Sequence, residues 1–180
     1  MMTELQNRRT KKMMLWFGMI SMAMTFAGLT SAYVVSSTRA DWITDFNMPE
    51  PFYYSTLLIL LSSGTFFWAE RAIKSNMLSQ AKLGVWGTLV LALLFIYTQF
   101  QGFQAIIDQG YYFTGAESTI TTSFLYVLVL LHLTHLTAGI LVLLIVLIRL
   151  YRRAYTAEKS LGMELAVLFW HFLDFLWLYL

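Results

Sequence analysis

Long apolar stretches alternate with short polar ones along the chain. A hydrocarbon core about 30 Å thick is crossed by a helix of roughly 20 mostly apolar residues. Five stretches meet this requirement, near residues 13–36, 54–73, 82–107, 122–148 and 164–180. The connections between them are short, so neighbouring helices should run antiparallel. The pattern predicts an all-α fold: a polytopic membrane helix bundle of five transmembrane helices that forms a single domain over residues 1–180.

The first apolar stretch could be mistaken for a secretory signal peptide. It follows a basic segment, residues 8–12, and continues to about Val35. The apolar region of a signal peptide is shorter, roughly 7–15 residues. We therefore expect this stretch to remain in the membrane as the first spanning helix.

Composition agrees with a membrane protein. Hydrophobic residues make up 58% of the chain and charged residues only 12%, about half the charged fraction of a typical soluble domain. The chain contains no cysteine, which excludes disulfides, thiolate metal sites and CxxC redox chemistry.

Basic residues lie on alternate sides of the predicted spans. Of the 12 lysines and arginines, all but Arg39 lie in the N-terminal segment, or in or beside the second and fourth connections. The first and third connections are acidic instead. Because cytoplasmic loops near helix ends carry the excess of lysine and arginine, the distribution predicts a cytoplasmic N-terminus and a periplasmic C-terminus.

Small residues at helical spacing indicate packing faces. Gly28 lies four residues before Ala32, and Gly64 follows two serines in the second stretch. Gly139 lies seven residues after His132, on the same face of the fourth stretch. Small residues let helix backbones approach closely within a bilayer, so Gly28, Gly64 and Gly139 are predicted at helix–helix contacts.

Ionisable side chains at bilayer depth are costly and therefore mark a candidate site. His132 and His135 are three residues apart on the fourth stretch, and His171 and Asp174 are three apart on the fifth. Each pair therefore shares one helical face. With a rise of about 1.5 Å per residue, His132 is level with Asp174, and His135 with His171. We expect the two pairs to meet if these helices touch.

Three hypotheses account for this polar cluster. The side chains could link the two helices, with imidazoles satisfying the carboxylate. Alternatively, His135 and His171 could be axial haem ligands from facing helices. A buried Asp–His pair could also handle protons.

Three glutamines, Gln99, Gln101 and Gln104, approach the outer end of the third stretch. We predict that they form hydrogen bonds at the membrane interface and do not line a pathway.

Two motifs resemble a known family. The sequence WHFLDFLWL at residues 170–178 closely resembles the last-helix signature of subunit III of haem–copper oxidases. The sequence HLTHLTAG at residues 132–139 is similar to the paired-histidine motif of that family. Looser similarities at residues 61–69 and 27–33 extend the resemblance over nearly the whole chain, in the order found in the family.

The resemblance implies a compact bacterial five-helix subunit III that lacks the first two helices of larger members. It implies a non-catalytic subunit of a proton-pumping bacterial cytochrome c oxidase in the inner (plasma) membrane, which stabilises subunit I, binds lipid and supports proton uptake in aerobic respiration. No residue of this chain is expected to be catalytic or to bind a cofactor or metal, because haem and copper belong to partner subunits.

The expected partners are subunit I, other oxidase subunits and phospholipid, with a respiratory supercomplex as a further candidate and no nucleic acid. Alternatives are subunit III of a quinol oxidase, a membrane cytochrome b or a small transporter.

Three positions depart from the family pattern. The family often has glutamate after serine in this first helix, where Met22 follows Ser21 here. Any role of that carboxylate in lipid contact or proton behaviour should therefore not be transferred to this chain. Glu70 and Arg71 replace the family's adjacent histidines.

Overall fold

The computed structural model describes residues 2–39, 42, 49–113, 119–156 and 160–180. These residues form five helices and no strand: α1 (Met2–Ser36), α2 (Pro51–Lys74), α3 (Leu78–Asp108), α4 (Ile120–Tyr151) and α5 (Leu161–Tyr179). Each helix is long and apolar enough to cross a membrane. The predicted all-α, five-helix fold is therefore confirmed. The helices extend beyond most of the predicted spans, because a helix does not have to end where the hydrocarbon ends.

Local sequence signals define the helix ends. Pro51 opens α2 at a position where its missing N–H costs nothing, and a capping box between Thr119 and Thr122 opens α4. Three helices are followed, two positions after their last residue, by a residue with positive φ. These residues are Asn76 after α2, Gly110 after α3 and Arg153 after α4. In each case the next residue donates its N–H to a carbonyl five residues earlier, as in a Schellman motif.

The helices α2 and α3 pack together more extensively than any other pair of helices in the described structure. At Gly84 of α3, an added Cβ would lie only 2.8 Å from Cβ of Ala69 and 3.0 Å from the carbonyl oxygen of Thr65 on α2. The hydroxyls of Thr65 and Thr88 bond across the same contact at 2.8 Å. Further along α3, an added Cβ at Gly102 would lie 2.8 Å from the ring of Phe52.

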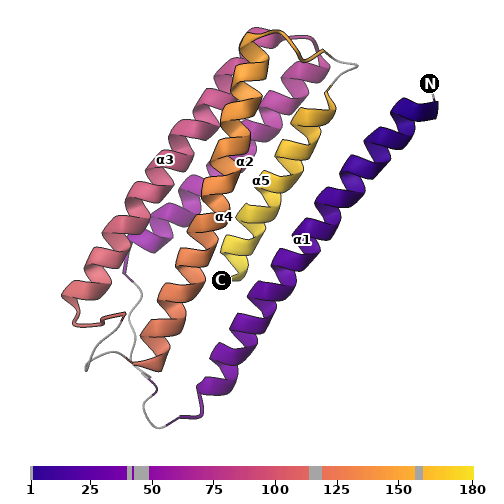
Figure 1. The fold of residues 1–180 in the computed structure, drawn as a ribbon. Coiled ribbons are helices and arrows are strands. Elements are labelled where there is room, and N and C mark those ends of the chain that lie inside the picture. The colour runs from indigo at the N-terminus through magenta and orange to yellow at the C-terminus, as the bar shows by residue number, and fades with distance from the viewer. Residues whose placement is uncertain (1, 40–41, 43–48, 114–118, 157–159) are drawn as a thin grey trace.

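The helix α1 is attached more loosely than the others. Figure 1 shows it along one side of the bundle, beside α5, and its described residues contact only α4 and α5. Met19 and Phe26 are its buried apolar anchors. Towards the N-terminal end of α1, Lys12 pairs with Glu164 at 2.9 Å. The rest of its surface is largely apolar and exposed, which suits contact with lipid.

The predicted glycine contacts have different outcomes. Gly139 packs against α5, since an added Cβ would lie 2.8 Å from Leu173 and 3.3 Å from Trp170. The prediction is wrong within this chain for Gly28 and Gly64, where an added Cβ would meet nothing within 4 Å. Both glycines face away from the bundle, because helical spacing identifies a face but does not say which neighbour covers it.

The orientation of the bundle in the membrane stays a prediction, which cysteine labelling can check. Ser79 and Gln109 are exposed near opposite ends of α3, and the natural chain has no cysteine to react. We expect a membrane-impermeant maleimide to label Gln109→Cys in intact cells, and Ser79→Cys only after the membrane is opened. Labelling of both variants in intact cells would contradict the predicted topology.

Candidate functional site

A row of hydroxyl groups on α2 holds α5 in place. The indole nitrogen of Trp170 donates to Oγ of Ser62 at 3.1 Å, and that of Trp177 donates to Oγ1 of Thr56 at 3.1 Å. Ser62 is fully buried. Each hydroxyl in turn donates to a carbonyl of its own helix, so these polar groups are satisfied without water.

His171 extends this row at the surface of the α2–α5 pair. Its Nδ1 is hydrogen-bonded to Oγ of Ser63. The same nitrogen lies 3.9 Å from Oδ2 of Asp174, one helical turn further along α5. Asp174 is only 3% exposed, and within the described residues neither of its oxygens has a hydrogen-bond partner. Ser63, His171 and Asp174 therefore form one polar cluster between α2 and α5, which we call the Ser63 cluster.

The predicted pairing of Asp174 with the histidines of α4 is wrong. The only histidine within 4 Å of the Asp174 carboxylate among the described residues is His171 on its own helix. His132 lies beside Trp177 instead, with ring centroids 5.3 Å apart, and Gly139 lies beside Leu173. The two helices are thus shifted by about one turn, roughly 5.4 Å, from the register that depth alone predicted.

His132 occupies the interior of the bundle without a polar partner. It is fully buried among the rings of Phe26, Phe95 and Trp177. Neither ring nitrogen has a hydrogen bond within the described part of the chain. A buried polar group without a partner costs about 1–3 kcal/mol, so this position weakens the bundle and does not hold two helices together.

The prediction that Gln99 forms hydrogen bonds at the membrane interface is wrong. Gln99 is fully buried, and both polar atoms of its side chain lack a hydrogen-bond partner among the described residues. The other two glutamines are exposed and bond to their own helix, Gln101 to Tyr97 and Gln104 to Asp108. Gln99 and Gln104 are five residues apart, which places them on different faces of the helix. This spacing was the signal in the sequence that Gln99 does not share the exposed face of Gln104.

His135 and His171 face different helices. The ring of His135 packs against Phe26 of α1, with centroids 5.6 Å apart, and its Nδ1 bonds to the carbonyl oxygen of Leu131 at 2.8 Å. His171 bonds to Ser63 of α2. Because the two imidazoles lie against different helices, their geometry gives no support to a haem shared between them.

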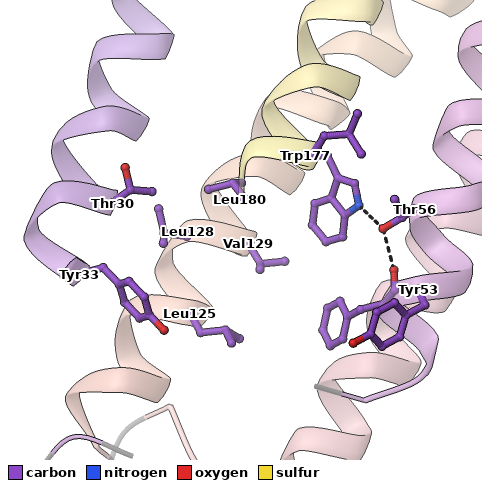
Figure 2. A pocket seen from close by; sticks show the side chains of 11 residues that line it. Thr30, Tyr33, Tyr53, Thr56, Leu125, Leu128, Val129, Trp177 and Leu180 are labelled. Carbon is purple, nitrogen blue, oxygen red and sulfur yellow. Dashed lines mark hydrogen bonds between the residues drawn. The ribbon is translucent and has the colours of Figure 1, made fainter. Parts of the chain in front are cut away.

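A cavity of about 500 Å³ lies beside the last turn of α5. Figure 2 shows its walls: Thr30 and Tyr33 come from α1, Val129 from α4, and Thr56 from α2, with Trp177 on α5. Most of the remaining lining is apolar, and the hydroxyls of Thr30 and Thr56 already have partners in Tyr179 and Trp177. The cavity therefore offers space to an apolar ligand.

Comparison with known proteins assigns the family. The family model described as cytochrome c oxidase subunit III matches residues 10–180, a range that contains the Ser63 cluster, His132, His135 and the cavity. The chain belongs to the cytochrome c oxidase subunit III family. The predicted resemblance is confirmed.

Relatives within the cytochrome c oxidase subunit III family are similar over most of this chain. The protein named cytochrome c oxidase subunit 3 from Marchantia polymorpha is 34% identical over 133 residues, which cover 71% of this chain and 46% of that protein. The protein of the same name from Alkalihalophilus pseudofirmus is 30% identical over 87% of this chain and 73% of its own length. That from Spodoptera frugiperda is 36% identical over 77% of this chain and 90% of its own length. The chain thus spans about half the length of several curated relatives.

Proposed function

We propose that this chain is the non-catalytic subunit III of a proton-pumping bacterial cytochrome c oxidase in the inner membrane. The observation that carries the proposal is the family match over residues 10–180, made by a chain with five helices able to span a membrane. The cytochrome c oxidase subunit 3 of Alkalihalophilus pseudofirmus supports a bacterial setting. In this proposal the chain binds subunit I, and other oxidase subunits carry the haem and copper.

The cavity beside Trp177 supports a lipid-binding role. Its volume of about 500 Å³ lies within the range of ligand pockets, roughly 300–1,000 Å³. Apolar cavities tend to exclude water, and the medium around this bundle is hydrocarbon. We propose that an acyl chain of a membrane phospholipid occupies the cavity, between Thr30 of α1 and Val129 of α4.

The Ser63 cluster supports a role in proton uptake. A hydroxyl, an imidazole and a carboxylate lie together on helices able to span a membrane. The imidazole and the carboxylate can each bind or release a proton, and the hydroxyl can donate and accept hydrogen bonds. The side chain of His171 is 36% exposed, so the cluster is open to neighbouring subunits. In this proposal the cluster affects proton movement in subunit I and carries no redox chemistry.

Purification of the complex tests the proposal. The tagged chain, expressed with its natural partners and extracted in mild detergent, is expected to bring a haem–copper subunit with it, together with phospholipid detected by mass spectrometry. The complex should consume oxygen with reduced cytochrome c as donor, whereas activity with quinol alone would indicate a quinol oxidase.

The chain expressed alone is expected to show no Soret band. A stoichiometric haem that disappears in His135→Ala or His171→Ala would overturn the subunit III proposal in favour of a membrane cytochrome b. His132→Phe is the matched control, because it removes the third histidine of the chain.

A further inference from the structure

One exposed face of the α2–α5 pair differs from the other surfaces of the bundle. On α2, Leu60, Gly64 and Phe67 recur at helical spacing and are exposed. On α5, His171 and Phe175 follow each other at a spacing of one turn. The rings of Phe67 and His171 lie 6.5 Å apart, which places both rows on one continuous surface. We call these five residues the His171 face.

The His171 face lies deep in the membrane. His171 is ten residues from the start of α5, or about 15 Å along the axis, and Gly64 is thirteen residues from the start of α2, or about 20 Å. In a core of about 30 Å, both positions are near the middle. Lipid headgroups do not reach this depth, and hydrocarbon offers no hydrogen bond.

His171 has an unused hydrogen-bonding atom on this face. Its Nδ1 is taken by Ser63, and no hydrogen bond to its Nε2 is formed by any residue that the structure describes. Behind it, the carboxylate of Asp174 is buried and also lacks a hydrogen-bond partner in the described chain. Ionisable side chains at this depth almost always face a bundle interior, a water-filled cavity or another protein group. An imidazole that faces lipid would be an exception.

Gly64 provides a second, independent indication. The packing of this chain does not require a glycine there, because an added Cβ would meet nothing within 4 Å. Glycine in a membrane helix allows the backbone of another helix to approach closely. Gly64 leaves space for the backbone of another helix, and Nε2 of His171 is available to bond a polar side chain on that helix. One helix that carries a polar side chain would satisfy both.

We propose that the His171 face is the docking surface for one membrane-spanning helix of another oxidase subunit. That helix lies across Gly64, between Phe67 and Phe175, and presents a polar side chain to Nε2 of His171. The inference rests on the proposed function, since it takes the partner from the same oxidase. The exposed face of α1 around Gly28 lacks an ionisable group at this depth and is left to lipid.

Photo-cross-linking in the complete oxidase tests the proposal without disturbing the glycine or the histidine. Benzoylphenylalanine is placed at Phe175, which is 66% exposed, or at the control Phe100 of α3, which is 63% exposed. The probe at Phe175 is expected to cross-link to a peptide from a spanning helix of another subunit, and that at Phe100 to lipid. Cross-links from Phe175 to lipid only, or to a second copy of this chain, would overturn the proposal.

A matched pair of glycine variants provides the second measurement. Gly64→Leu is expected to lower the amount of chain recovered with the oxidase about tenfold, as overpacking of an interface does. Gly28→Leu makes the same change at a glycine that is equally free of contacts, and it should leave recovery unchanged. If the natural chain associates with the oxidase and Gly64→Leu associates equally well, the docking surface is wrong. If the natural chain does not associate at all, the proposed function itself fails.

Discussion

Gly84→Leu is expected to prevent α2 and α3 from packing and to abolish accumulation of the folded chain. The atoms that an added Cβ would meet at 2.8 and 3.0 Å are Cβ of Ala69 and the carbonyl oxygen of Thr65. Neither atom can move by rotation of a side chain, so the two helices would have to separate. Gly84→Ala adds only the Cβ and should reduce the free energy of unfolding by about 1–3 kcal/mol.

Gly87→Ala is the matched control for this prediction. Gly87 lies one turn from Gly84 on α3, but the nearest atom to an added Cβ is Cγ2 of Thr65 at 3.8 Å, which is an ordinary contact. We expect this variant to be neutral or slightly stabilising, because alanine favours a helix more than glycine does. Thermal unfolding in detergent, followed by circular dichroism, compares the variants. Equal midpoints for Gly84→Ala and Gly87→Ala would show that the close contact does not limit stability.

Gly84 also shows where prediction of the fold from the sequence stops. The five spans followed from the lengths of the apolar stretches, because the thickness of a bilayer sets a length that the sequence must match. The packing partners did not follow. Gly28, Gly64 and Gly84 all lie within apolar stretches, yet only Gly84 touches a neighbouring helix. A glycine permits close approach, but which helix approaches depends on how the whole bundle is arranged.

The sequence singled out four polar residues of the candidate site, but it did not predict which of them contact one another. His132, His135, His171 and Asp174 lie within helices that are long and apolar enough to span a membrane. Depth along the axis gave an approximate level for each residue, but not the tilt of the helices or their rotation, which changes by about 100° from one residue to the next. An error of one turn placed Asp174 beside the wrong helix. Ser63, which is hydrogen-bonded to His171, was not among the predicted members of the site.

Asp174→Asn is expected to assemble normally and to lower the turnover of the oxidase several-fold. Asp174 is 3% exposed, and its carboxylate has no hydrogen-bond partner among the described residues. It therefore does not link α5 to α4, and a buried carboxylate in this state reduces stability. Asparagine has nearly the same shape without the charge, so stability should be unchanged or higher.

The expected loss of turnover follows from the position of the carboxylate. An ionisable group that is buried without a hydrogen-bond partner in the described chain costs stability, so its presence is better explained by function than by packing. Asp174 lies 3.9 Å from His171, whose ring reaches the surface of the chain. Asparagine at this position cannot take up or release a proton. If the Ser63 cluster supports proton uptake, oxygen consumption and the number of protons pumped per electron should both fall.

His132→Phe separates this role from the general cost of a buried polar group. His132 is also buried and lacks a partner within the described chain, but it lies among aromatic rings away from the Ser63 cluster. We expect this variant to assemble and to turn over like the natural oxidase. Recovery of the complex and oxygen consumption are measured for both variants. If Asp174→Asn reduced recovery as much as Asp174→Ala while turnover per complex stayed constant, Asp174 would stabilise the helices and would have no role in proton uptake.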